Sequence, residues 1–209
     1  MVTKSEIVEV PELDLQMLYP IIRGISWSSL IQNNFSQQEK DLIRDKQTGK
    51  KVVVRKHKDP KEIFEQKKYY TKDGKLGIPG NAIKAAMVAA ARISKDKMTE
   101  MRQAFHVIGD VIPFSKHSKP VMKEDCFPVN LGGRNYTVRA EIEEWELPIK
   151  IQYNANFVSA GRLINLLSLA GFHCGLLDYR PNGRKCSGGN GLFELVFDDV
   201  KKNKTKPKG

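Results

Sequence analysis

The residues best suited to chemistry lie near the C-terminus, in a glycine-rich segment that spans residues 171–191. This segment carries Arg180, Arg184 and Lys185 between an apolar run and a strand-like sequence. Glycine lets a ligand approach the backbone closely, and arginine presents paired donors that match a phosphate. Exposed backbone N–H groups beside positive charge would form an anion site. An ordinary solvated loop is the alternative interpretation, because glycine-rich loops are common.

The positive charge of the chain is concentrated in two segments. The net charge is +11, and residues 40–75 contribute 13 basic against 6 acidic residues. Residues 201–209 add five lysines and no acid. Concentrated positive charge is typical of a surface that contacts phosphates. For residues 200–209 we expect a disordered basic tail instead, because this composition cannot form a packed core.

Four histidines are the candidates for acid–base catalysis, which needs a general base and a general acid. His57 in the basic segment and His117 in a predicted loop could meet a ligand, but neither has a recognisable partner in the sequence. His106 lies in an apolar strand-like run, where a core histidine is the simpler interpretation; the fourth is His173. The sequence contains no P-loop, zinc-hydrolase pattern or nucleophile elbow. We therefore expect binding rather than catalysis, and no catalytic residue.

The cysteines predict neither a disulfide framework nor a metal site. Cys126, Cys174 and Cys186 are three in number, so they cannot all pair with one another, and we expect reduced thiols. His173 and Cys174 lie near Cys186, but the segment has no C-x-x-C pair and no evident fourth ligand. We expect no metal and no cofactor.

Length and composition favour a soluble globular protein with one domain. The chain has 209 residues, of which 40% are hydrophobic and 28% are charged. No apolar run approaches the roughly 18 residues of a membrane span, and the N-terminal residues lack the apolar core of a signal peptide. These features predict a cytoplasmic location and no membrane partner.

The first half of the chain predicts a strand, a basic insertion and a helix. Residues 17–25 are β-branched and apolar, with Pro20 marking a break or a strand start. Residues 26–77 form the basic insertion, in which we expect a helix from Ser36, a strand at residues 52–54, and a helix over residues 60–70 that begins after the cap Asp59. Asn81 is the expected N-cap of an alanine-rich helix over residues 82–93.

The second half predicts three strands, a helix and a last strand. Residues 105–114 indicate a core strand, broken at Gly109, and residues 115–135 a loop or hairpin insertion. The alternating residues 136–143 and 148–153 are expected to pair with each other. A helix capped by Ser159 should end at Gly171, before a strand over residues 192–197. With the insertions set aside, this order is βαββαβ, which predicts an α+β, ferredoxin-like or RRM-like core with an antiparallel sheet.

Three motifs resemble the RAMP superfamily, which includes the RNA-binding backbone subunits of CRISPR effector complexes and repeat-RNA endonucleases. The motifs are residues 22–26 after the first strand, residues 77–84 at the first helix, and the glycine-rich residues 187–193. The chain is also similar to bacteriophage proteins with a signature matched here by Ala170, Gly171, Gly175, Asp178, Arg180 and Pro181. The resemblance follows the order of elements from Leu18 to Phe197 and implies a single RAMP-like domain over residues 1–209.

The resemblance implies a fold that grips an RNA backbone and separates bases with inserted hairpins. Residues 26–77 and 115–135 would be these projections, and copies of the protein would form a homo-oligomer along a small or guide RNA that pairs with a target strand. The predicted RNA-binding residues are Arg55, Lys56, Lys58, Asn81, Lys84, Arg134, Arg139, Tyr179, Arg180, Arg184 and Lys185. Candidate stacking residues are Trp27, Tyr69, Tyr70 and Tyr179. The alternatives are a phage single-stranded-DNA-binding or annealing protein and a metal-independent repeat-RNA endoribonuclease.

Overall fold

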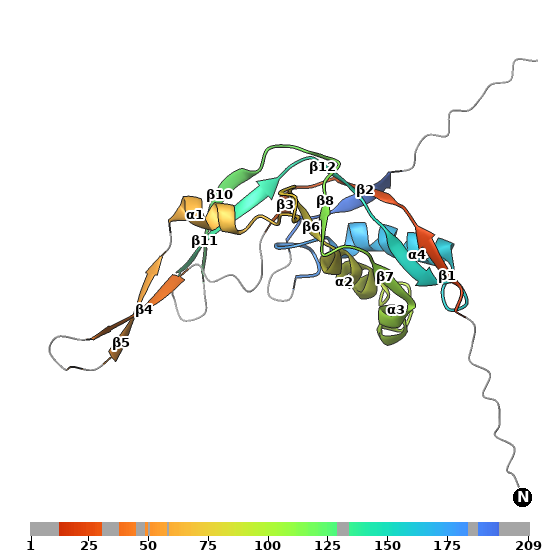
Figure 1. The fold of residues 1–209 in the computed structure, drawn as a ribbon, viewed down its shortest axis with the longest axis horizontal. Helices are drawn as coiled ribbons and strands as arrows, with labels where there is room; N and C mark the ends of the chain where they lie inside the picture. Colours follow the sequence, from red (N-terminus) through yellow and green to blue (C-terminus); the bar gives the residue numbers. More distant parts are fainter. Residues whose placement is uncertain are drawn as a thin grey trace, which may run out of the picture.

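The structure is a computed structural model of the whole chain (Figure 1). It describes residues 13–30, 38–44, 49, 51–57, 59–128, 134–183 and 188–196. Within these ranges, only the backbone is described for residues 38–44, 51–57, 126–128 and 134–136.

The core is an antiparallel layer whose strands are interrupted. The first strand breaks at Tyr19–Pro20 into β1 (Leu15–Leu18) and β2 (Ile21–Gly24), as Pro20 predicts, because proline lacks an N–H for the ladder. β1 pairs with β13 (Ile151–Asn154), which pairs with β7 (Phe105–Val107). β2 lies between β14 (Phe193–Val196) and β12 (Trp145–Pro148), and β12 also pairs with β9 (Lys116–His117). Across the layer the order is β14, β1–β2, β12–β13, β7.

Two helices pack against one face of this layer (Figure 1). They are α2 (Gly80–Ala90) and α4 (Ala160–Leu169), and α4 continues into a π-helical turn, η1 (Ala170–Cys174). A third helix, α3 (Met98–Ala104), contacts α2 and leads into β7. Fully buried residues from helices and strands form the core between them, including Ile22, Ile83, Met87, Leu147, Ile151, Leu163, Leu166 and Phe193. The fold is therefore α+β with antiparallel sheets.

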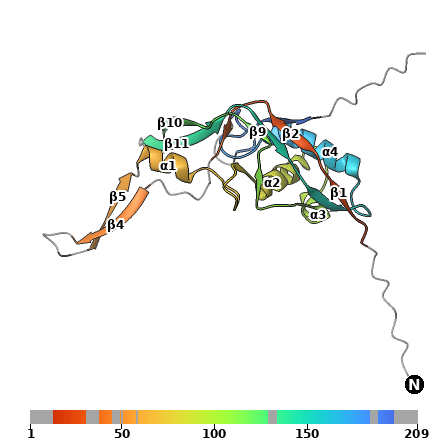
Figure 2. The same ribbon diagram turned by 45° about the horizontal axis from the view of Figure 1, so that its top comes forward.

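The remaining elements extend from the core toward the end opposite β1 (Figures 1 and 2). A long hairpin consists of β10 (Val121–Pro128) and β11 (Arg134–Ile142), and β3 (Ser28–Ser29) pairs with the other edge of β11. Farther out lies the hairpin of β4 (Gln38–Arg44) and β5 (Lys51–His57). It is followed by α1 (Pro60–Gln66), whereas β6 (Gly77–Pro79) pairs with β8 (Val111–Pro113) beside the core.

The predicted pairing of residues 136–143 with residues 148–153 is wrong. β11 pairs with β10 and β3, whereas the later segment, β12–β13, pairs with β1, β2, β7 and β9. Sequence alternation defines the two faces of a strand but not its partner. Residues 137–142 are buried on both faces of β11, which the alternation does not predict.

Two predicted helix ends and one predicted helix also differ from the structure. The N-cap of α2 is Pro79 and not Asn81, and no side chain caps this end. Gly80 is the first residue of the helix, where a Cβ would lie 2.2 Å from the carbonyl oxygen of Gly109. Gly171 does not end α4, since the chain continues through η1 to Gly175, which has φ 65°. The helix expected from Ser36 is wrong for residues 38–44, which form β4. The predicted caps Asp59 and Ser159 are confirmed, as is the break at Gly109.

Candidate nucleic-acid interface

The glycine-rich segment forms a loop whose base is closed by backbone hydrogen bonds. Leu176 N donates to Gly191 O at 2.9 Å, and Asn190 N donates to Tyr179 O at 3.1 Å. Gly191 N in turn donates to Trp27 O at 2.7 Å. The expectation that these N–H groups are exposed to an anion is therefore wrong for the base of the loop, because they donate to carbonyls within the fold. Residues 184–187, which include Arg184 and Lys185, lie outside the described residues.

Close backbone approach explains why the base of the loop needs glycine. A Cβ on Gly191, which has φ 75°, would lie 2.0 Å from the carbonyl oxygen of Leu176. A Cβ on Gly188 would lie 2.1 Å from that of Tyr179. The facing residues Leu177 and Tyr179 have φ of 63° and 59°, which is unusual for residues with a side chain. Backbone strain of this kind persists where the surrounding structure holds it, and it occurs often at functional sites.

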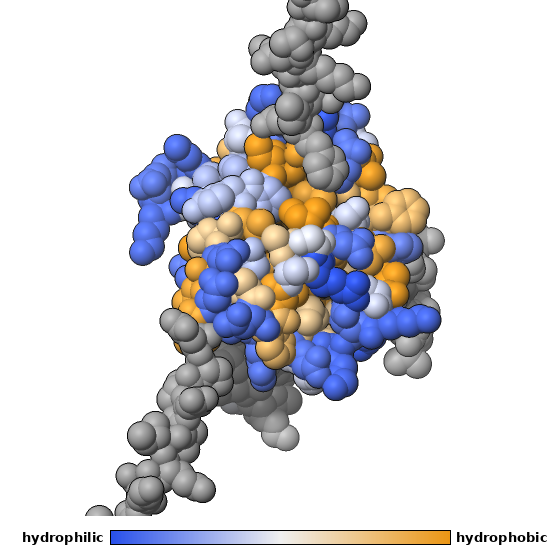
Figure 3. Space-filling model, turned by 90° about the vertical axis from the view of Figure 1, so that its right-hand side faces the viewer, coloured by the Kyte–Doolittle hydropathy of each residue, from blue (hydrophilic) through white to orange (hydrophobic). Residues whose placement is uncertain are grey.

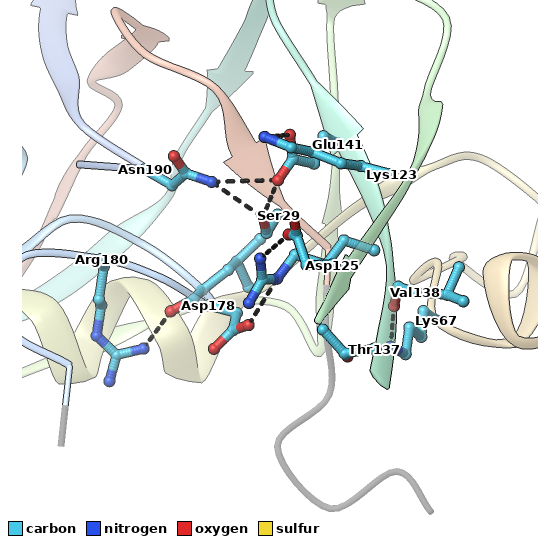
Figure 4. Close-up of polar contacts among 12 residues, drawn as sticks. Ser29, Lys67, Lys123, Asp125, Thr137, Val138, Glu141, Asp178, Arg180 and Asn190 are labelled. Atoms are coloured by element: carbon cyan, nitrogen blue, oxygen red, sulfur yellow. Dashed lines mark hydrogen bonds and ion pairs between the residues drawn. The ribbon is translucent and has the colours of Figure 1, made fainter. Parts of the chain in front are cut away.

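A buried ion-pair cluster attaches this loop to β11 (Figure 4). Asp178 of the loop accepts from Nε of Arg139 at 3.3 Å, and Asp125 of β10 accepts from Nη1 of the same side chain. The Arg139 guanidinium also lies over the ring of Tyr179, 4.8 Å from its centroid. Only 6% of the Arg139 side chain is exposed. Arg139 and Tyr179 are thus in contact, and they lie in the polar cluster at the base of the loop.

A second part of the cluster joins the loop to β3. Glu141 of β11, which is buried, accepts from Ser29 Oγ at 2.9 Å and from Asn190 Nδ2 at 3.3 Å (Figure 4). Lys123 Nζ lies 3.5 Å from the other carboxylate oxygen of Glu141. Asn190 also donates to Ser29 Oγ at 3.1 Å. The loop, β3 and the β10–β11 hairpin are therefore held by polar contacts around the buried carboxylate of Glu141, with Lys123 at the exposed edge.

Lys67 joins α1 to the same cluster. It follows the last turn of α1 and is 1% exposed. Its ammonium group donates to the carbonyl oxygen of Val138 and lies 3.4 Å from Thr137 Oγ1. Burial, reinforced by the positive charge of Arg139 and opposed by Asp178, lowers the pKa of Lys67 to about 8. One polar cluster therefore joins three elements: the glycine-rich loop, the β10–β11 hairpin and α1. The last of these follows the β4–β5 hairpin.

The structure places the other predicted RNA-binding residues in several locations. Asn81 and Lys84 line a pocket of 270 Å³ beside Arg102 of α3, and Lys84 Nζ lies 3.2 Å from His106 Nδ1. Arg180 is half-buried and donates to the carbonyl of Leu177. Three of the residues lie on described strands: Arg55 and Lys56 on β5, and Arg134 on β11. Lys58, Arg184 and Lys185 are outside the described residues.

The candidate stacking residues divide into partly buried and exposed rings. Tyr179 contacts Arg139, and Tyr69 is partly buried against the core, where burial raises its pKa. Tyr70 is 45% exposed and Trp27 is 38% exposed. The Trp27 carbonyl accepts from Gly191 N, so the backbone of Trp27 lies against the base of the loop.

The histidines lie in separate environments. His117 lines a pocket of 460 Å³ with Arg23, Lys116 and Glu146, and its Nδ1 faces the carbonyl oxygen of Ser118 at 2.9 Å. Arg23 and Lys116 both contact Glu146, so much of the charge in this pocket is compensated. His173 packs edge-on against the ring of Phe172. His57 ends β5.

Most of the buried cluster could not be found from the sequence. Ser29, Lys67, Asp125 and Glu141 carry no motif, and Asn190, which lies in the glycine-rich motif, has no predicted role. The hydrogen bonds of the cluster join residues 14 to 161 positions apart, from Arg139 and Asp125 to Asn190 and Ser29. The available signal was the alternation of β11, because Thr137, Arg139 and Glu141 share one face. Three polar residues on a face that is buried require partners.

Comparison with known proteins leaves the family of the chain open. No protein-family model matches the sequence, and no curated protein matches it. Within the described residues, no helix is long and apolar enough to cross a bilayer. The same part of the chain contains no group of three or more His, Cys, Asp or Glu side chains placed to hold a metal ion. Cys174 is a buried free thiol, and burial raises its pKa.

Proposed function

We propose that the protein is a non-catalytic RNA-binding protein with a ferredoxin-like, RAMP-like core. It grips the backbone of a single-stranded small or guide RNA and assembles in several copies along it. The strand order β14, β1–β2, β12–β13, β7, with α2 and α4 on one face, supports a split βαβ core of this type. The concentration of positive charge in residues 40–75 supports a nucleic-acid partner.

The face of the sheet away from α2 and α4 is a weak candidate for the RNA contact. Arg23 on this face is bound by Glu146 through both Nε and Nη2, at 3.0 and 2.8 Å, and Lys116 lies 3.3 Å from the same carboxylate. Glu194 is exposed beside Arg23 on β14. Paired charges attract phosphates less than free ones do. This arrangement favours the projections, rather than the sheet face, as the binding surface.

The end of the molecule that carries α4 and β1 is also a weak candidate. Figure 3 views this end, where hydrophobic and hydrophilic side chains are mixed. β1 contributes the exposed apolar residues Leu15 and Met17. Contacts between protein copies suit such a surface better than contacts with phosphates do.

The observation that carries the proposal is the polar cluster around Arg139. Through Asp178 and Asp125, Arg139 fixes the loop to the hairpin, and Lys67 fixes the helix that follows the basic β4–β5 hairpin. Loops that bind a ligand are more effective when a rigid scaffold positions them. This polar cluster therefore holds the described base of the glycine-rich loop and the helix α1, which follows the basic β4–β5 hairpin, against the same strand β11.

The nucleic acid that copurifies with the full-length protein tests this proposal. We expect an absorbance ratio at 260 and 280 nm typical of a ribonucleoprotein, and sequencing should yield a discrete small RNA. Ribonuclease, but not deoxyribonuclease, should remove the material. Light scattering should give a mass for several protein copies per RNA, which falls to the monomer after ribonuclease treatment.

The alternative functions give different results in the same experiment. Heterogeneous single-stranded DNA would support the DNA-binding or annealing protein and contradict the proposal. Cleavage of repeat RNA that is lost in His117→Ala or His57→Ala would support the endoribonuclease. If no nucleic acid copurifies and the protein binds no added oligonucleotide, all three functions are contradicted.

A further inference from the structure

The β4–β5 hairpin sorts its charges onto two different faces. In its register Lys40 is directly opposite Arg55, and Arg44 is directly opposite Lys51. Residues two apart in a strand share a face, so both pairs lie on the same face, with the pair of Leu42 and Val53 between them. This face, which we call the basic face, carries four basic residues and no acidic one along the described strands.

The other face of the hairpin is nearly neutral in composition. It carries Glu39 opposite Lys56, Asp41 opposite Val54, and Ile43 opposite Val52. The basic residues are thus not spread evenly over the hairpin, although the amino-acid sequence presents them in one run. Lys56, which was predicted to bind RNA together with Arg55, belongs to the face with the acidic residues.

Like charges directly opposite one another destabilise an antiparallel pair. The hairpin has two such pairs, and the two pairs are separated by four residues, about 14 Å along the strands. If Glu39 and Asp41 exchanged places with one residue of each like-charge pair, the repulsion would be relieved and the composition of the hairpin would stay the same. A ligand with several negative charges in a row relieves it too, because each phosphate lies against two cations.

We propose that the basic face of the β4–β5 hairpin binds two phosphates of a single-stranded RNA, one at each like-charge pair, and that the face with Glu39 and Asp41 lies away from the RNA. This inference rests on the proposed function and deepens it, because it names the surface of the projection that meets the RNA. The contact is with the backbone and is independent of base sequence.

Salt-dependent binding of the full-length protein to a fluorescein-labelled oligouridine tests the inference. The variant Lys51→Gln/Arg55→Gln removes one partner from each like-charge pair. The matched control Lys56→Gln/Lys61→Gln also removes two positive charges, from the other face of β5 and from an exposed position on α1. The basic-face variant should reduce the slope of log K against log salt by about 1.4, whereas the control should keep the wild-type slope.

The outcomes separate the two proposals. If the wild type binds and both variants weaken binding equally, the hairpin contributes net charge only and the inference is wrong. An unchanged slope in the basic-face variant also overturns it and leaves the proposed function standing. If the wild type binds neither oligouridine nor the copurified RNA, the proposed function itself fails. Should the variant unfold, Lys40→Gln/Arg44→Gln on β4 probes the same face with the same expected slope.

Discussion

Arg139 on β11 and Asp178 in the glycine-rich loop form an ion pair, Nε to Oδ2 at 3.3 Å, across 39 residues of the chain. The pair is the point at which the loop meets the long hairpin. Because Asp125 contacts the same guanidinium, the arginine compensates two carboxylates at once. The contact explains how a loop rich in glycine keeps a defined position.

Arg139→Met should destabilise the protein by about 2 kcal/mol, because the partly buried carboxylates of Asp125 and Asp178 lose the cation that compensates them. The measurement is urea unfolding followed by circular dichroism. Arg23→Met is the control, since Arg23 forms its ion pair with Glu146 at the surface, with 48% of its side chain exposed. Exposed pairs contribute little, so this variant should unfold close to the wild-type midpoint. Equal losses in both variants would contradict a special role for the Arg139 cluster.

Lys67 should make stability depend on pH in the alkaline range. Its pKa in the folded protein is about 8, lowered from 10.5, so between these values the unfolded chain binds a proton that the folded protein has lost. The free energy of unfolding therefore rises with pH between about 8 and 10.5, and Lys67 adds no pH dependence below this window. Lys67→Met removes the contribution, so the wild type should become more stable relative to this variant from pH 7 to pH 10.

Urea unfolding at several pH values measures that difference. Lys61→Met is the control, because Lys61 is exposed on the same helix and should leave the pH dependence unchanged. A difference between wild type and Lys67→Met that stays constant, or that falls as the pH rises, would show that Lys67 is not held as described.

Local sequence signals predicted the core elements well. Proline at position 20 and glycine at position 109 marked real breaks, and Asp59 and Ser159 cap helices through bonds to backbone N–H groups. These signals act within a few residues, so they can be recognised without knowledge of the fold. Periodicity likewise identified Val138, Ala140 and Ile142 as one buried face of a strand.

Partners distant in sequence could not be predicted in the same way. The alternation of residues 136–143 places Arg139 on the face opposite Val138 and Ala140, but it does not reveal that α1 and the loop cover that face. The glycines of the loop were assigned to an anion, whereas two of them are required where backbones approach closely. Both errors have one physical origin, because burial and backbone approach depend on the tertiary fold.

Two neighbouring glycines should respond differently to alanine. Gly191→Ala places a Cβ 2.0 Å from the carbonyl oxygen of Leu176 at a positive φ, so we expect a loss of about 2 kcal/mol or more. Gly189→Ala meets no atom within 4 Å and should leave stability nearly unchanged. Thermal unfolding of both variants distinguishes this packing role from an anion-binding role, which would affect binding more than stability.

Arg184 and Lys185 should contribute to RNA affinity without contributing to stability. Arg184→Ala/Lys185→Ala should weaken binding of an oligouridine and reduce the salt slope by about 1.4, because two phosphate contacts are lost. Lys116→Ala/Lys119→Ala is the matched control: it removes two exposed lysines near the sheet face, where Glu146 already compensates Lys116. Thermal unfolding of the loop variant should match the wild type, since the cluster around Arg139 is left intact. A wild-type affinity and slope in this variant would remove the loop from the binding surface, and the basic face of the β4–β5 hairpin would then have to bind the RNA without it.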